Sequence, residues 1–174
     1  MLLPIQTFPA EVLRRTALPV ASVDSKVVRL MEDMLETMYK GKGIGLAATQ
    51  VGVLRRVIVA DLSEDRDGKT GLFMANPEVM WRDPDETYTY EEGCLSLPGH
   101  YAKVTRPRRI RVRYLDKANK PRELEAEDLL SQCIQHEIDH LNGGLFIDHI
   151  SKLKRDIILR KIDKGLKQEE GHLL

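Results

Sequence analysis

Two histidines four residues apart, with a glutamate directly after the first, are the residues of this sequence best suited to metal chemistry. They lie in the stretch QHEIDHLNGGLF at residues 135–146. Positions four apart in an α-helix lie one turn apart on the same face, so His136 and His140 can direct two imidazole nitrogens at one metal ion. Glu137 lies about 100° further round the helix, where its carboxylate can take a proton from water at the metal. The simpler interpretation is two partly buried histidines with solvent-facing acids between them, because so short a pattern also arises by chance.

A catalytic metal site needs a third protein ligand, and the residues after the second histidine are poor candidates. The pattern HExxHxxGxxH continues here as far as Gly143 but has Phe146 where its third histidine would stand, and phenylalanine cannot bind a metal. His149 follows an apolar run with no pattern behind it, so we expect a surface or capping role for it. Glu169 and Glu170 lie in a polar tail. The third ligand is therefore expected upstream.

The two cysteines compete for the place of the third ligand. Cys133 precedes His136 on the same predicted helix, but Cys133, His136 and His140 would span about 10 Å along its axis, which strains a tetrahedral arrangement. Cys94 lies in YEEGCLSLP, an extended segment in which Gly93 can act as a hinge that brings a thiolate across to a helix. We favour Cys94 as the third ligand and interpret Cys133 as apolar lining. The alternative for Cys94 is that it is only a small, buried hydrophobic residue. Three protein ligands leave a fourth position for water, as in catalytic rather than structural sites.

A run of small residues, GKGIGLAATQVG at 41–52, would let a substrate backbone approach closely. It fits G-x-G-x-x-A, but it follows a predicted helix and precedes a predicted strand, which reverses the order that dinucleotide binding requires. We therefore reject nucleotide binding. Gln50 offers an amide donor for a developing oxyanion. The alternative is that this loop is only a tight connection packed against the core.

Length and composition limit the classes of function. The 174 residues suit one domain, since folding at this size buries roughly two thirds of the unfolded surface. The 27 lysines and arginines balance 27 aspartates and glutamates, so no global field favours nucleic acid. Two cysteines do not make a disulfide framework and fit a reducing compartment, and no apolar run approaches the ~20 residues of a membrane span. We expect a soluble, cytoplasmic protein with a single catalytic domain over residues 1–174.

Hydrophobic periodicity predicts a fold of the α+β class. Apolar residues at three- and four-residue steps predict helices, and period-two alternation predicts strands. The predicted elements are a helix at 24–40, two pairing strands at 55–62 and 71–77, a hairpin of 109–116 with 122–126, a helix at 127–141 and a last helix at 151–168. Antiparallel β-sheets and hairpins are expected to pack around the central HExxH helix, with one helix nearer the N-terminus and one at the C-terminus.

Three segments, in this order and at these separations, resemble the three motifs of the peptide deformylases. They are GIGLAATQ at 43–50, EGCLS at 92–96 and QHEIDHL at 135–141. The likeness covers nearly the whole chain and is to the short bacterial form. It implies a hydrolase that removes the N-formyl group from the starting methionine of new polypeptides and releases formate. The alternatives are a general HExxH metallopeptidase and a non-catalytic metal-binding relative.

The resemblance also implies roles for individual residues. It makes Cys94, His136 and His140 the metal ligands and Glu137 the general acid and base. The donors to the formyl oxygen would be the Gln50 side chain and the Leu95 backbone N–H. Gly43, Ile44 and Gly45 would align the substrate backbone, and Ile44, Leu129 and Cys133 would line the methionine pocket. It implies one divalent ion, Fe(II) first, with zinc, nickel or cobalt able to use the same ligands. Tyr101 stands where many bacterial members have an arginine, so contacts beyond the methionine are expected to differ.

The last predicted helix carries seven basic residues, which outnumber Asp156 and Asp163 and share the helix with an apolar strip. These basic residues are Lys152, Lys154, Arg155, Arg160, Lys161, Lys164 and Lys167. The resemblance implies docking on the ribosome, where RNA phosphates would attract the helix with strong salt dependence. The alternative is a plain solvated face. The expected partners are thus N-formyl-methionyl nascent peptides and the ribosome, with no membrane, and the protein is expected to be a monomer.

Overall fold

The computed structural model describes residues 1–172 of the protein. An amphipathic helix lies along one side of the molecule. This helix, α1 (Ser25–Lys40), begins after Asp24, whose carboxylate accepts hydrogen bonds from the backbone N–H groups of Lys26 and Val27. Its buried apolar stripe consists of Val27, Met31, Met34, Leu35 and Met38. The helix predicted at 24–40 is therefore confirmed, including its end before Gly41.

Five antiparallel strands form the main sheet in the order β1-β2-β3-β6-β7. Their bounds are Gly45–Ala47 for β1, Val57–Ala60 for β2, Leu72–Arg82 for β3, Arg109–Leu115 for β6 and Pro121–Glu127 for β7. The predicted pairing of the strands at 55–62 and 71–77 is confirmed, as is the hairpin that begins at residue 109. The strand predicted at 55–62 is shorter than predicted, since β2 spans Val57–Ala60, and β3 continues beyond the predicted residue 77 to Arg82. The small-residue run at 41–52, predicted as a loop, includes β1 and the short 3₁₀ helix η2 (Ala48–Val51).

A second sheet consists of one long hairpin, β4 (Thr87–Cys94) with β5 (Leu97–Pro107). The sequence predicted only an extended segment around Cys94, because polar and aromatic residues dominate both strands. The one buried residue of β4 is the charged Glu92, so the sequence of this strand lacks the apolar alternation of a half-buried strand. The hairpin turn holds Leu95 and Ser96, directly after the cysteine.

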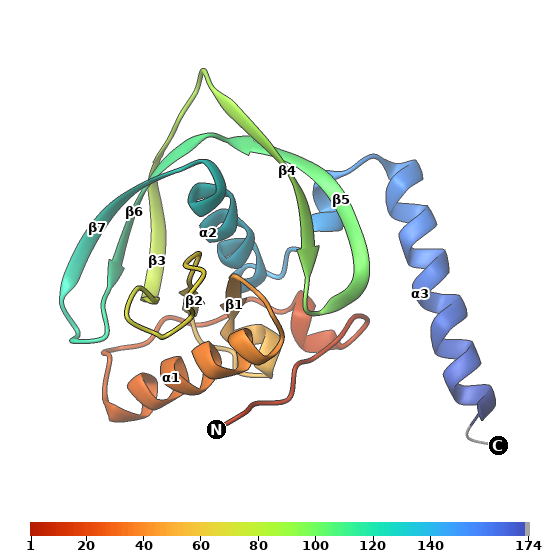
Figure 1. Ribbon diagram of the computed structural model, residues 1–174, viewed down its shortest axis with the longest axis horizontal. Helices are drawn as coiled ribbons and strands as arrows, with labels where there is room; N and C mark the ends of the chain where they lie inside the picture. The colour runs from red at the N-terminus through yellow and green to blue at the C-terminus, as the bar shows by residue number, and fades with distance from the viewer. Residues whose placement is uncertain (173–174) are drawn as a thin grey trace.

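The helix α2 (Asp128–Leu141) lies between the two sheets and contacts both (Figure 1). It is buried along most of its length, which confirms the expected central HExxH helix. The chain leaves α2 through Gly143 at a φ of 78°, where an added Cβ would lie 2.5 Å from the backbone oxygen of Arg14. Glycine is therefore required there both by conformation and by the close approach of the N-terminal segment.

The last helix, α3 (Lys152–His172), extends away from the body of the molecule (Figure 1). Near its N-terminal end, Ile158 packs into a cluster with Leu97, Val104 and Phe146, which joins α3 to the β4–β5 sheet. The predicted helix at 151–168 is confirmed and continues to His172. Two further 3₁₀ helices, η1 (Glu11–Arg14) and η3 (Phe146–His149), cover the end of α2. Among the described residues, no helix combines the length and the apolar character needed to cross a bilayer.

Candidate metal centre and cleft

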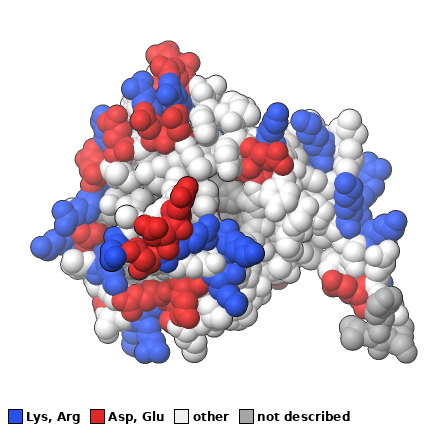
Figure 2. Space-filling view, viewed as in Figure 1, with Lys and Arg blue, Asp and Glu red and all other residues white. Residues whose placement is uncertain are grey.

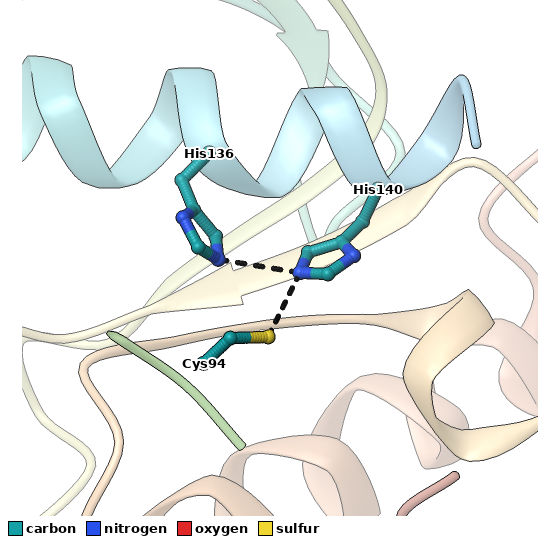
Figure 3. Close-up of side chains that lie close together, drawn as sticks. All are labelled: Cys94, His136 and His140. Atoms are coloured by element: carbon teal, nitrogen blue, oxygen red, sulfur yellow. Dashed lines mark hydrogen bonds between the residues drawn. The ribbon is translucent and has the colours of Figure 1, made fainter. Parts of the chain in front are cut away.

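Helix α2 and the end of strand β4 bring three metal-binding side chains together (Figure 3). His136 and His140 extend from one face of α2, and Cys94 is the last residue of β4. One donor atom from each lies within 4.8 Å of the other two. The Nε2 atoms of the two histidines are 3.2 Å apart, and the Cys94 Sγ is 3.3 Å from His140 Nε2. The three residues that the sequence placed in one site thus lie together.

The donor set fits a soft or borderline divalent cation. Burial alone would raise the pKa of the Cys94 thiol, but the charges and hydrogen bonds of His140 and His136 lower that pKa well below its usual value. A thiolate and two imidazole nitrogens whose lone pairs converge are the ligands that iron, zinc, nickel and cobalt accept.

A buried carboxylate fixes the orientation of one histidine. Glu92 lies two residues before Cys94 on β4, and its Oε1 is 2.7 Å from Nδ1 of His136. Arg106 from β5 donates to both oxygens of Glu92, from Nε at 2.7 Å and from Nη2 at 2.9 Å. Burial opposes ionisation of Glu92, but the bonds from Arg106 and His136 outweigh it and lower its pKa to about 2. Because His136 Nδ1 is held by this carboxylate, its Nε2 faces the other two donors.

Glu137 is buried next to the three donors. Burial raises the pKa of its carboxyl group to about 7. Its Oε2 has no hydrogen-bond partner within residues 1–172. A buried carboxylate with a free oxygen and a pKa near neutrality suits a group that accepts and returns a proton.

The amide of Gln50 is fixed so that its nitrogen faces the site. Its Oε1 accepts a 2.9 Å hydrogen bond from the backbone N–H of Ala47. Its Nε2 lies 3.3 Å from Cys94 Sγ and 3.2 Å from Ser96 Oγ. Since the oxygen accepts from Ala47 and the N–H₂ group donates to Cys94 and Ser96, the donor end of the Gln50 amide is turned toward Cys94.

A cleft of about 540 Å³ opens beside Cys94 and His136, and every predicted site residue except His140 lines it. The lining residues from the predicted set are Gly43, Ile44, Gly45, Gln50, Cys94, Leu95, Leu129, Cys133, His136 and Glu137. Cys133 lies one helical turn before Glu137, and its Sγ donates to the backbone oxygen of Ile44 at 3.6 Å. Burial raises the pKa of this thiol well above its usual value. Cys133 is thus a neutral wall residue in this arrangement.

The mouth of the cleft is formed by the turn after α1 and by the β4–β5 hairpin. The Leu95 side chain packs against Gly41 and Gly43, where an added Cβ would lie 3.0 Å or 3.1 Å from Leu95 Cδ1. The Tyr101 ring lies over Gly93 and is 62% exposed at the rim. An exposed aromatic ring therefore stands at the outer end of the cleft.

Sequence reasoning missed the residues that support the donors. Glu92 begins the EGCLS motif but had no predicted role, Arg106 belongs to no motif, and Phe146 entered the prediction only as a residue that cannot bind a metal. Its ring stacks on His136 with centroids 6.3 Å apart. The spacing of Glu92 and Cys94 is the one available signal, because residues two apart on an extended segment face the same side. His149, expected in a surface or capping role, is 38% exposed and lies 2.8 Å from Asp139 Oδ2.

Comparisons with known proteins agree with the geometry. A family model described as polypeptide deformylase matches residues 2–156. The peptide deformylase of Methylocella silvestris is 56% identical over 167 residues, which are 94% of this chain and 85% of that protein. A crystal structure of a peptide deformylase from Legionella pneumophila superposes with a TM-score of 0.89 at 42% identity and covers 98% of both chains. One from Ehrlichia chaffeensis in complex with actinonin has a TM-score of 0.87 at 39% identity, covering 94% of this chain and 97% of that one.

An α+β fold around an HExxH helix, with a thiol and two imidazoles converging beside a buried glutamate, defines a metal-dependent hydrolase. The comparisons narrow this class, and the chain belongs to the peptide deformylase family. The reaction of this family is the hydrolytic removal of the formyl group from the N-terminal methionine of polypeptides.

Proposed function

We propose that Cys94, His136 and His140 hold one divalent metal ion and that formyl-methionyl peptides are hydrolysed beside it. The observation that carries this proposal is the convergence of three donor atoms within 4.8 Å, beside a cleft that Cys94 and His136 line. A bound divalent ion supplies a Lewis acid and lowers the pKa of water toward neutrality. Fe(II) is the proposed ion, and zinc, nickel and cobalt suit the same ligands.

Glu137 is proposed to take the proton of the attacking water on its free Oε2 and to return it to the leaving amine. Its burial supports this role, because a carboxyl group with a pKa of about 7 can both accept and donate a proton near neutral pH. Gln50 Nε2 and the backbone N–H of Leu95 are proposed to stabilise the formyl oxygen as negative charge develops on it. The position of the Gln50 amide supports this assignment, because its oxygen is held by Ala47 and its N–H₂ group is directed at Cys94, where one of its hydrogen bonds would be exchanged for one to the substrate oxygen.

The backbone of Gly43, Ile44 and Gly45 is proposed to align the substrate as an added strand beside β1. One side of β1 is already paired with β2, and Ile44 O accepts from the backbone N–H of Asp61 at 2.9 Å. The opposite side of β1 faces the cleft. Ile44, Leu129 and Cys133 are proposed to surround the methionine side chain, which is supported by their position in the cleft wall.

An assay of formate release tests the proposed chemistry. Protein prepared without oxygen and loaded with Fe(II) is expected to release formate from formyl-Met-Ala-Ser, and Glu137→Gln is expected to lose most of this activity while it keeps its metal. Acetyl-Met-Ala-Ser is the matched substrate. Equal rates on the formyl and acetyl peptides would indicate a general metallopeptidase, and bound metal without formate release would indicate a non-catalytic relative. Inhibition by actinonin is also expected, since a relative of this fold was solved in complex with it.

The basic face of α3 is proposed to dock on ribosomal RNA while the protein works as a cytoplasmic monomer. Lys161, Lys164 and Lys167 are exposed on α3. Figure 2 shows Lys and Arg side chains gathered over the part of the molecule where α3 lies. Ribosome pelleting over a salt series tests this proposal. Reversal of these three lysines to glutamate is expected to abolish pelleting at low salt, whereas reversal of three exposed lysines elsewhere, Lys26, Lys103 and Lys120, is expected to leave it nearly unchanged. Equal effects of both triple variants would reject docking through α3.

A further inference from the structure

A continuous chain of charged groups leads from His136 to the surface on the other side of α2. Arg106, which donates to both oxygens of Glu92, directs its remaining Nη1 at Oδ2 of Asp139 at 2.8 Å. The same oxygen of Asp139 lies 2.8 Å from Nε2 of His149. His149 is therefore linked to the metal ligand His136 through Asp139, Arg106 and Glu92 in turn.

Burial falls steadily along this chain toward solvent. The side chains of Glu92 and Arg106 are each 4% exposed, Asp139 is 28% exposed and His149 is 38% exposed. A second cavity of about 270 Å³, lined in part by Arg106, Asp139 and His149, lies along the face of α2 that is turned away from the cleft. The outer part of the chain is therefore reached by solvent from a side that substrate does not use.

The orientation of Glu92 depends on how the Arg106 guanidinium is held. A guanidinium is a planar fork, so a rotation that improves one hydrogen bond moves the others. Nε and Nη2 of Arg106 hold Glu92, and Nη1 is fixed only if the Asp139 carboxylate stays in place. Asp139 lies on α2, where its carboxylate can turn about two side-chain torsions. The imidazole of His149, from η3, fixes that carboxylate from the outer side.

We propose that His149 is a positioning residue for the metal centre, acting through Asp139 and Arg106 on the carboxylate of Glu92. The inference rests on the metal site proposed above and adds a residue that touches neither metal nor substrate. Mutation of a carboxylate that holds a metal-bound histidine typically lowers metal affinity or activity by about 10- to 100-fold. For a residue that acts on such a carboxylate through two others, we expect an effect near the lower end, about tenfold.

The test compares His149→Leu with His149→Gln in the full-length protein. Glutamine can place an N–H donor near the position of Nε2, whereas leucine removes the donor and keeps apolar bulk. The readouts are the affinity for Co²⁺ alone, measured by competition with a chelator, and the absorption bands of the Co²⁺-thiolate complex. His149→Leu is expected to lower the affinity about tenfold and to shift the bands, and His149→Gln is expected to restore most of both. His100→Leu is the matched control, because His100 alternates with Tyr101 along β5 and points away from the cleft.

The outcomes separate this inference from the proposed metal site. Wild-type protein that binds no Co²⁺ would overturn the metal site itself. Wild-type protein that binds Co²⁺, with a His149→Leu variant of the same affinity and spectrum, would overturn only the positioning role. A lowered melting temperature without a change in affinity or spectrum would show that His149 is merely structural. A His149→Gln variant as weak as His149→Leu would show that the hydrogen bond to Asp139 is not what matters.

Discussion

Gly45 lies so close to Cys133 that a Cβ on the glycine would stand 2.7 Å from the cysteine Sγ. The same Cβ would also press against the carboxylate of Glu137. Strand β1 and helix α2 therefore meet at their closest point beside the proposed proton acceptor. A side chain at this position would displace Glu137 or widen the cleft.

We expect Gly45→Ala to lower kcat/KM about 100-fold or more while the protein stays folded. Overpacking of this kind typically destabilises by about 1–3 kcal/mol, and even a 1 Å displacement of a catalytic group can cost about 100-fold in rate. Formate release and thermal unfolding, measured on the same preparation, check both parts. Gly165→Ala is the control, since a Cβ at Gly165 in α3 meets nothing within 4 Å. A Gly45→Ala variant with normal kcat/KM would show that this contact can relax without consequence.

Removal of the Gln50 amide tests whether a fixed donor assists the reaction. Gln50→Ala is expected to lower kcat by about 10²–10³, the loss typical of one oxyanion donor, with a smaller change in KM. Gln50→Glu is a useful companion, because it keeps the size and the acceptor of the side chain while it replaces the amide donor with a carboxylate that would repel a developing oxyanion. If Gln50→Glu retained the wild-type kcat, the proposed donor role would be wrong.

The grouping of Cys94, His136 and His140 could be predicted from the sequence, because metal-binding chemistry restricts the spacing of its ligands. Two histidines one helical turn apart on α2 carry information by themselves, and the failed extension at Phe146 directs the search for a third ligand upstream. The helices α1 and α2 were equally predictable, since their apolar periodicity is strong and each ends at a clear signal. Local sequence therefore determines the part of the site that lies on one helix.

The β4–β5 hairpin and the support it gives to the site could not be predicted in the same way. Its strands are two-sided and polar, so neither alternation nor apolar length marks them. Arg106 looks like one basic residue among several in TRPRRIR, and only the fold shows that it is the buried one. Its partners Glu92 and Asp139 are distant in sequence, so the ion pairs arise from tertiary packing that no local pattern reports.

Loss of the buried guanidinium should destabilise the protein far more than loss of an exposed one. Arg106→Leu leaves Glu92 as a buried charge with fewer partners, and such broken pairs typically cost about 3–5 kcal/mol. Arg111→Leu is the matched control on β6, where the arginine is 47% exposed and lies 3.5 Å from Glu123. That variant is expected to change stability by about 1 kcal/mol or less. Urea unfolding with excess chelator measures the free energy of unfolding without a contribution from metal binding. Similar losses of this free energy in both variants would contradict the larger role of the buried guanidinium.

Asp148 joins the N-terminal segment to the end of the central helix. Its Oδ2 accepts hydrogen bonds from Arg14 Nη1 at 2.7 Å and from the backbone N–H of Leu145 at 2.9 Å. Arg14 also donates from Nη2 to Oδ1 at 3.1 Å and from Nη1 to the backbone oxygen of Gly143 at 3.2 Å. Burial opposes ionisation, but these contacts outweigh it and lower the pKa of Asp148.

The pH dependence of stability follows from the direction of this shift. Because the folded-state pKa of Asp148 lies below its unfolded value of about 3.9, the carboxylate stabilises the fold fully above that value and loses its contribution as the pH falls through the folded pKa. The stability difference between wild type and Asp148→Asn should therefore be constant from about pH 6 to 7 and shrink toward zero below about pH 3. Its size should stay below about 1 kcal/mol, since both partners are partly exposed. Urea unfolding of the metal-free proteins across this pH range measures this stability difference, and Asp163→Asn on α3 is the exposed control. A stability difference that grew on acidification would mean that folding raises the pKa of Asp148.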